Sequence, residues 1–238
     1  MNLTLIGYGK MGKAIHEQAK LRGHSIPLII DLHNQHDLTA ENLKNTDVVI
    51  EFTTPETAYN NVNFCLQQGI PVICGSTGWL HKLEEAKATA MAHHTGLIVA
   101  SNFSVGVNLF FELNKKLAEL MRHYPEYNPA LLEVHHTQKL DSPSGTAISL
   151  AEHILKGIPG KEIWVNHPTE KREELAIISE RKDPAPGTHH VKYSSAIDDI
   201  EIIHTAHNRT GFALGAVLAA EYIVGKKGFY TMKDVLGI

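Results

Sequence analysis

The segment LTLIGYGKMGKAI, Leu3 to Ile15, decides the fold. Its first four residues form a mostly apolar run that predicts a short buried strand, and apolar residues recur at helical spacing from Met11 on. Between strand and helix, Gly7, Gly9 and Gly12 follow the spacing G-x-G-x-x-G. In this setting the first glycine permits a tight turn, the second lets a pyrophosphate approach the backbone, and the third lets the helix pack closely. The segment therefore predicts a dinucleotide-binding domain.

The next predicted strand, residues 25–30, ends at Asp31, where such domains place a carboxylate that binds the adenosine ribose. Leu32 follows, where a protein that binds a 2′-phosphate often has arginine, whereas Lys10 and His33 would favour that phosphate. We predict NADH, NADPH or both as cofactor, with a preference for NADH. A flavodoxin-like or other open α/β sheet with a tight first turn is the alternative.

Three further apolar strands, at residues 47–52, 70–74 and 97–100, alternate with helices. This order predicts a doubly wound parallel sheet of the Rossmann type, covered on both faces. Ligands of such sheets bind at the carboxyl ends of the strands. The segments EFTTP, GSTGW and ASNFS follow those ends and are expected to complete the cofactor crevice.

The pattern changes after about residue 104, where a long amphipathic helix leads into an α+β module with a mixed or antiparallel sheet. Its strands are expected at residues 131–138, 174–180, 189–195 and 200–206, with one helix near 143–156. The apolar helix after Arg209 is expected to pack back on the first domain, and the last ten residues to form a short turn. The predicted domains are 1–103, completed by 210–238, and 104–209.

The segment EVHHTQKLDSPSGTA, Glu133 to Ala147, concentrates polar groups at one strand–helix junction. Asp141 or Ser142 is expected to cap the helix, with Pro143 at its first position. The backbone N–H groups at Ser144, Gly145 and Thr146 would then point outward and form an anion cradle. An ordinary polar strand–loop–helix is the alternative.

Two adjacent histidines and a lysine stand just before this junction. His135 and His136 can carry protons near neutral pH, and Lys139 supplies a positive charge. Together with the anion cradle, they predict a site that binds an anionic substrate and transfers a proton to it.

The 238 residues carry a formal net charge of −4, which offers no basic excess for general nucleic-acid binding. No apolar run is long enough to span a membrane, and the first residues do not resemble a signal peptide. Cys65 and Cys74 lie in apolar surroundings without metal-ligand spacing and predict buried thiols in a reducing, cytoplasmic compartment.

Sixteen histidines raise the question of a metal site. Three adjacent pairs occur, but neighbours on a strand point to opposite faces and do not readily share one ion. The sequence contains neither HExxH nor CxxC. We therefore expect no functional metal.

EVHHTQKLDSPSGTA resembles the signature E-x-H-H-x-x-K-x-D-A-P-S-G-T-A of the dihydrodipicolinate reductase (4-hydroxy-tetrahydrodipicolinate reductase) family of lysine biosynthesis. GYGKMG, EFTTPE, GSTG, ASNFSVGVN, GTHH and HTAHNRTGFALGA follow the family's order along nearly the whole chain. The chain differs from the family pattern at Glu51, Ser142 and Thr188, where aspartate, alanine and glutamate are usual.

The resemblance implies a cytoplasmic, homotetrameric enzyme that reduces a small cyclic imine carrying two carboxylates. The central module would bind this substrate and form the subunit contacts. His135 would donate the proton with Lys139 as its partner, and His136, Lys139, Gly145 and Thr146 would bind the substrate. The residues implied on the cofactor side are Gly7, Tyr8, Gly9, Lys10, Met11, Gly12, Asp31, Phe52, Thr53, Gly75, Ser76, Thr77, Ala100, Ser101, Asn102, Phe103 and Arg209.

Two rivals share the cofactor prediction. An amino-acid dehydrogenase such as aspartate dehydrogenase pairs similar domains but does not explain the segment KLDSPSGT. A nicotinamide-sensing regulator would usually carry a DNA-reading module, and neither a helix-turn-helix nor a basic stripe is evident. The segment DPAPGTHH, residues 183–190, is expected to be a loop that either closes over a ligand or merely connects two strands.

Overall fold

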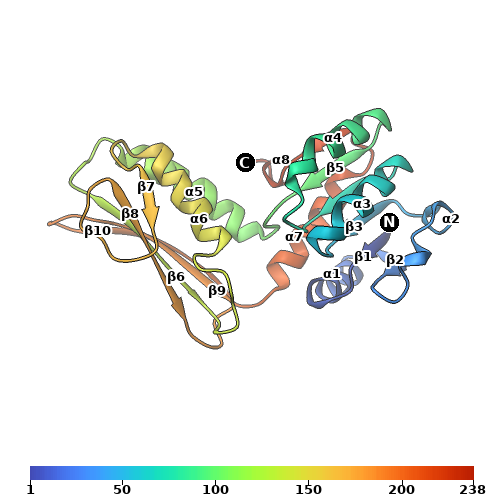
Figure 1. The fold of residues 1–238 in the computed structure, drawn as a ribbon, viewed down its shortest axis with the longest axis horizontal. Helices are drawn as coiled ribbons and strands as arrows, with labels where there is room; N and C mark the ends of the chain where they lie inside the picture. The colour runs from blue at the N-terminus through green and yellow to red at the C-terminus, as the bar shows by residue number, and fades with distance from the viewer. The chain divides into compact units, whose positions relative to one another are not determined.

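The computed structural model describes residues 1–238, and the chain divides into two compact units (Figure 1). Unit 1 combines the two ends of the chain, Met1–Val105 and Arg209–Ile238. Unit 2 is the middle of the chain, Gly106–Asn208. No helix has both the length and the apolar character needed to cross a membrane.

Unit 1 is built on a six-stranded parallel sheet with the order β11-β5-β4-β3-β1-β2. The strand order reverses at β1, because β2 lies on one side of it and β3 on the other. Loops that follow neighbouring strands at such a reversal open beside each other and form the usual ligand site. The strands are β1 (Asn2–Ile6), β2 (Ser25–Ile30), β3 (Val48–Glu51), β4 (Val72–Cys74), β5 (Gly96–Val99) and β11 (Gly228–Tyr230).

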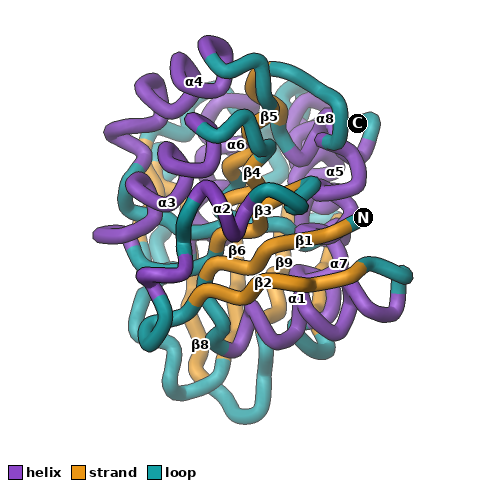
Figure 2. The backbone as a smooth tube through the Cα atoms, turned by 90° about the vertical axis from the view of Figure 1, so that its right-hand side faces the viewer, coloured by secondary structure: helices purple, strands orange, loops and turns teal.

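Helices cover both faces of this sheet (Figure 2). One face packs against α1 (Lys10–Leu21), α7 (Thr210–Ile223) and α8 (Met232–Leu236). The other packs against α2 (Ala40–Leu43), α3 (Pro55–Gln67) and α4 (Leu83–Ala92). Two 3₁₀ turns, η1 (Gln35–Asp37) and η2 (Leu80–Lys82), precede α2 and α4. The Rossmann-type sheet predicted from the sequence is confirmed.

The C-terminal helix α7 lies close against the sheet because its facing residues are small. A Cβ on Gly215 would stand 1.7 Å from the carbonyl oxygen of Phe103, so only glycine fits there. The prediction of a plain turn after α7 was wrong: β11 pairs in parallel with β5, from Gly228 opposite Gly96 to Tyr230 opposite Ile98. A strand of three residues is too short to show a periodicity in the sequence.

Unit 2 has a five-stranded sheet with the order β10-β9-β6-β8-β7. β6 runs parallel to β8 and antiparallel to β9, which confirms the mixed sheet expected from the sequence. Helices α5 (Val105–Met121) and α6 (Gly145–Gly157) pack on it through one apolar cluster. The strands are β6 (Asn128–His135), β7 (Ile163–Val165), β8 (Glu174–Arg181), β9 (Gly187–Ser194) and β10 (Asp199–Ala206).

Three details of unit 2 differ from the prediction. β6 begins at Asn128, three residues earlier than expected, and the short strand β7 was missed. The segment 187–190 is the start of β9 and not part of a loop, because Gly187 pairs with Ala206 and Thr188 with Thr205 on β10. The loop between β8 and β9 is therefore confined to residues 182–186.

Candidate active site

The glycine loop after β1 depends on close backbone contacts. Gly7 has a φ of +96°, and a Cβ there would stand 2.0 Å from the carbonyl oxygen of Phe52 at the end of β3. A Cβ on Gly12 would stand 2.2 Å from the carbonyl oxygen of Gly7. At Gly9 no atom lies within 4 Å of the corresponding position. Two glycines thus close the loop, and the third leaves a bare surface at the start of α1, where a phosphate can approach.

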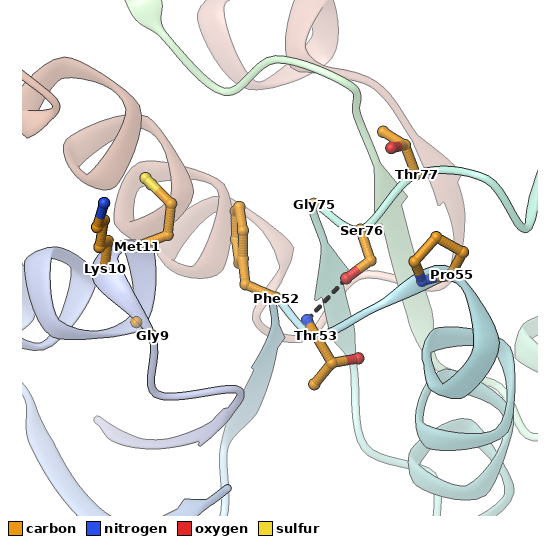
Figure 3. Close-up of a pocket in the computed structure, with 10 residues that line it drawn as sticks. Gly9, Lys10, Met11, Phe52, Thr53, Pro55, Gly75, Ser76 and Thr77 are labelled. Carbon is orange, nitrogen blue, oxygen red and sulfur yellow. Dashed lines mark hydrogen bonds between the residues drawn. The ribbon is translucent and has the colours of Figure 1, made fainter. Parts of the chain in front are cut away.

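A cavity of about 440 Å³ opens in front of this loop (Figure 3). In Figure 3, Lys10 and Met11 lie on one side of Phe52, and Ser76 and Thr77 lie on the other. Every lining residue except Pro55 was predicted as a cofactor contact from the sequence. The lining consists of Gly9, Lys10, Met11, Gly12, Phe52, Thr53, Pro55, Gly75, Ser76 and Thr77.

A buried carboxylate fixes the two loops on the far side of the cavity. Glu51 is fully buried and accepts hydrogen bonds from the Thr53 backbone N–H at 3.0 Å, the Thr53 hydroxyl and the Cys74 thiol at 3.0 Å. The Thr53 N–H also donates to the Ser76 hydroxyl at 2.8 Å, shown as a dashed line in Figure 3. Burial, reinforced by Glu51, raises the pKa of Cys74, so this thiol stays protonated.

The other predicted cofactor residues lie outside the cavity lining. Asp31 directly follows β2, and its neighbour Ile30, the last residue of the strand, accepts a hydrogen bond from the Gly7 N–H at 2.8 Å. Ala100, Ser101, Asn102 and Phe103 follow β5, and the Phe103 ring lies 5.7 Å from the Phe52 ring. Arg209 caps the start of α7. The Tyr8 hydroxyl is 2.8 Å from Nδ1 of His16.

These features fit a reduced nicotinamide dinucleotide. The bare glycine at the start of α1 suits a pyrophosphate, the lysine beside it supplies a positive charge, and a carboxylate ends the neighbouring strand.

In unit 2, strand pairing brings four ionisable side chains to the end of β6. Glu133 and His135 alternate with half-buried residues and point to the buried face. The register places Glu133 opposite His189 on β9, and His135 opposite Arg181 on β8. Glu133 is fully buried and both histidines are nearly so.

Glu133 is the centre of this group. The Ser144 backbone N–H donates to both carboxylate oxygens at 3.1 Å, and the Arg181 guanidinium lies 3.4 Å from Oε1. Oε2 lies 3.5 Å from Nδ1 of His135 and 3.8 Å from Nε2 of His189. Burial works to raise the pKa of Glu133, but the Ser144 hydrogen bonds and the nearby His135 hold it below its usual range. The group is therefore an anion at neutral pH.

The two histidines share one environment. Their rings meet edge to face, with centroids 5.1 Å apart. Burial lowers the pKa of His135, Glu133 opposes that effect, and Lys139 and Arg181 add to it. Burial, followed by His135, lowers the pKa of His189 to about 3. The Ser144 hydroxyl lies 3.2 Å from Nε2 of His189.

Glu133, His135 and His189 each place one oxygen or nitrogen within 4.8 Å of the others, a spacing that a metal ion could bridge. Arg181 already supplies a positive charge 3.4 Å from the same carboxylate. We therefore interpret the group as a hydrogen-bonded, charge-balanced network.

Lys139 lies in the turn after β6, where its backbone N–H donates to the carbonyl oxygen of His136 at 3.1 Å. Its Nζ contacts both oxygens of Asp141, at 2.7 and 2.8 Å. Burial works to raise the pKa of Asp141, but the bond from Lys139 outweighs it and keeps that pKa low. Lys139 therefore forms an ion pair with the carboxylate of Asp141.

The start of α6 differs from the prediction. Its N-cap is Ser144, whose side chain accepts from the Ala147 N–H, and not Asp141 or Ser142; Pro143 precedes the cap. The Ser144 backbone N–H faces inward to Glu133, because that buried carboxylate needs donors. Gly145 is exposed, with no atom near the position of a Cβ, so the first turn is open to a ligand there.

Sequence reasoning brought together His135, His136, Lys139, Gly145 and Thr146, which follow one another around this junction. It did not include their neighbours Glu133, Arg181 and His189, and it considered Asp141 only as a possible helix cap. A signal for Glu133 exists, because an acid stands between apolar residues at a core-facing strand position. Arg181 and His189 come from strand pairing over more than 45 residues, which the sequence does not display.

Comparison with known proteins adds to this geometry. The family model for the N-terminus of dihydrodipicolinate reductase matches residues 1–103, and the model for its C-terminus matches residues 106–236. The chain belongs to the dihydrodipicolinate reductase family.

A 4-hydroxy-tetrahydrodipicolinate reductase from Christiangramia forsetii is 48% identical over 99% of this chain and 98% of its own length. The dipicolinate-bound dihydrodipicolinate reductase from Paenisporosarcina sp. TG-14 has the same fold, with a TM-score of 0.78 and 24% identity over 98% of both chains. An amine dehydrogenase from Mycobacterium smegmatis shares the fold at a TM-score of 0.64 and 10% identity, over 98% of this chain and 95% of its own.

These relatives confirm the predicted family and the prediction of an NAD(P)H-dependent oxidoreductase. The two family models together match nearly the whole chain, and the Paenisporosarcina reductase shares its fold.

Proposed function

We propose that the chain reduces 4-hydroxy-tetrahydrodipicolinate to tetrahydrodipicolinate with NADH or NADPH, in the diaminopimelate route to lysine. The observation that carries this proposal is the junction of β6 and α6, where a buried histidine, a lysine and an open helix start stand within fifteen residues of sequence. Membership in the dihydrodipicolinate reductase family supports the same reaction.

The substrate is a small cyclic imine that carries two carboxylates and a hydroxyl. Loss of water leaves a conjugated ring, which is then reduced by one hydride and one proton. The bound nicotinamide supplies the hydride. The protein must hold two carboxylates, deliver a proton and keep water away from the ring.

His135 is the proposed proton donor. It ends β6, and its ring lies beside Glu133 and His189. An imidazole suits this role near neutral pH. Burial lowers the pKa of His135 in the free protein, and a substrate with two negative charges would favour its protonated form.

Lys139 is proposed to bind a substrate carboxylate and to stabilise negative charge that develops on the ring. Asp141 occupies it in the structure, with both oxygens within 2.8 Å of Nζ. A substrate carboxylate would take the place of Asp141. His136 and the first turn of α6, at Gly145 and Thr146, are proposed to bind the remaining carboxylate oxygens.

NADH is the proposed preferred cofactor. The carboxylate of Asp31 would repel a 2′-phosphate, and Leu32 beside it is 75% exposed and uncharged. Lys10 at the cavity is the residue that would favour NADPH.

The experiment that tests this function follows the oxidation of NADH and NADPH by the purified protein. The unstable substrate is generated in the cuvette from pyruvate and aspartate semialdehyde by the preceding synthase. We expect oxidation that depends on the synthase and is faster with NADH. Binding of NADH without oxidation would reject the reaction, and oxidation of an amino acid would favour an amino-acid dehydrogenase instead.

A cytoplasmic homotetramer is part of the same proposal. The edge strand β10 carries exposed isoleucines, Ile200 at 39% and Ile203 at 53%, which a second copy of the chain could cover. Both cysteines are free and buried, as suits a reducing compartment. Native mass spectrometry should give a mass of four chains.

A further inference from the structure

The two ring nitrogens of His135 face different surroundings. Nδ1 points to the buried side, 3.5 Å from Oε2 of Glu133. Nε2 lies against Gly187 on β9, where a Cβ would come within 3.1 Å of it. The absence of a side chain at residue 187 keeps Nε2 clear.

We propose that Glu133 is a positioning residue for the reduction: its carboxylate holds Nδ1 of His135, so that Nε2 carries the proton that is transferred to the ring. This inference rests on the proposed role of His135 as the proton donor. Glu133 itself stays ionised, and the transferred proton leaves Nε2 and joins a ring carbon, which returns His135 to its neutral form.

Glu133 is suited to this role because it cannot turn away. The Ser144 N–H binds both of its oxygens, and Arg181 lies against Oε1. Arg181 is itself fixed by the carbonyl oxygens of Asp141 at 2.7 Å and Glu180 at 2.9 Å. The same carboxylate therefore anchors the start of α6, where the substrate is proposed to bind, and the ring of the proton donor.

The distance of 3.5 Å is longer than a direct hydrogen bond. Contacts between catalytic groups are often long without ligand and shorten in the complex with substrate. A carboxylate on one imidazole nitrogen fixes the tautomer and stabilises the imidazolium, while the opposite nitrogen does the chemistry.

Five groups around His135 set its charge. Glu133 on β6 and Asp141 in the following turn favour the imidazolium, whereas Lys139, Arg181 and His189 oppose it. Proton donation needs the imidazolium, so kcat/KM falls as the pH rises through the pKa of His135. Removal of the negative charge at Glu133 lowers that pKa, and the fall then begins at a lower pH.

The test compares Glu133→Gln with Glu133→Asp and with the control Glu201→Gln. Glu201 pairs with Nδ1 of His190 at 2.8 Å on the exposed side of the sheet, so the control removes a similar contact away from His135. For Glu133→Gln we expect kcat at least ~10-fold lower, KM little changed, and the alkaline limb of kcat/KM shifted down by about one unit or more. Glu133→Asp keeps the negative charge and should return the alkaline limb of kcat/KM to its wild-type position. Glu201→Gln should match the wild type in kcat, KM and the pH profile.

An unmoved alkaline limb in folded Glu133→Gln, with or without a lower kcat, would overturn the positioning role. The same variants distinguish this failure from a failure of the proposed function, because His135→Ala with full turnover would reject the proton donor itself. Tm and NADH binding, measured on each variant, report whether it is folded.

A measurement on the wild-type protein does not depend on any variant. Nitrogen NMR of ¹⁵N-labelled histidine should show neutral His135 with its proton on Nδ1, toward Glu133, at a pH above its pKa. A proton on Nε2 in that state would overturn the proposal even where Glu133→Gln fails to fold.

Discussion

The cavity of unit 1 is lined by glycines, hydroxyl groups and apolar side chains with Lys10 as its one charged residue, whereas unit 2 gathers ionisable side chains around one buried carboxylate. In unit 1 the buried acid Glu51 accepts hydrogen bonds from Thr53 and Cys74 and thereby fixes the loops that follow β3 and β4. In unit 2 the buried acid Glu133 meets a histidine that is proposed to transfer a proton.

The largest expected effect separates chemistry from cofactor binding. His135→Ala or Lys139→Ala should lower turnover at least ~100-fold, because the reduction loses its acid or its carboxylate anchor. NADH binding, measured by fluorescence, and Tm should stay close to wild type. His190→Ala, which removes the half-buried neighbour of His189 on the opposite face of β9, is the control. Unchanged turnover in both variants would reject the proposed roles.

The next prediction tests the close backbone contacts of the glycine loop in unit 1. Gly7→Ala would place a methyl 2.0 Å from the Phe52 carbonyl oxygen at a positive φ, and should lose about 2–3 kcal/mol of unfolding free energy. Gly9→Ala meets no atom within 4 Å and should keep its stability while the Kd for NADH rises ~10-fold. Urea denaturation and a binding titration measure the pair. Equal free energies of unfolding for Gly7→Ala and Gly9→Ala would contradict the expected difference between the two glycines.

The third prediction concerns the free energy of unfolding, which depends on pH through the buried His189 of unit 2. The unfolded chain protonates His189 below the ordinary pKa of 6.5, whereas the folded protein keeps it neutral down to about 3. Acid therefore favours unfolding, and His189 alone should remove about 2 kcal/mol between pH 7 and pH 5. In His189→Gln, which can still bond Ser144, this part of the loss should vanish. Urea denaturation at both pH values measures it, and an identical loss in the variant would contradict the prediction.

The smallest effect concerns the ion pair of Lys139. Asp141→Asn should free Lys139 for the substrate and lower KM ~2- to 5-fold, since a partly exposed ion pair contributes less than about 1 kcal/mol. Steady-state kinetics with varied substrate measure the change. A higher KM would mean that Asp141 holds Lys139 in its working position instead of competing with the substrate.

Local patterns were enough to predict most of unit 1. β2 begins and ends where expected, because an apolar run follows the left-handed Gly23 and stops at a polar turn. The glycine loop was also predictable, because its three glycines follow a known spacing between an apolar strand and a helix. β11 was not, because three residues carry no period and the strand exists only through its pairing with β5.

The site in unit 2 was predictable only where its residues are close in sequence. The cap of α6 was placed at Asp141 or Ser142 because both are good caps, and the chain instead uses Ser144, whose N–H a carboxylate eleven residues away requires. His189 and Arg181 join the site through the register of β9 and β8, and no local rule fixes a register between distant strands.

The completion of unit 1 by Arg209–Ile238 bears on how the enzyme is made. A ribosome releases the glycine loop before unit 2, whereas the helix α7 and the strand β11, which finish the same core and sheet, emerge after unit 2. Unit 2 is continuous in sequence and can fold before the second segment of unit 1 has been synthesised. A nascent chain stalled before residue 209 should thus hold a folded unit 2 and an unfinished unit 1.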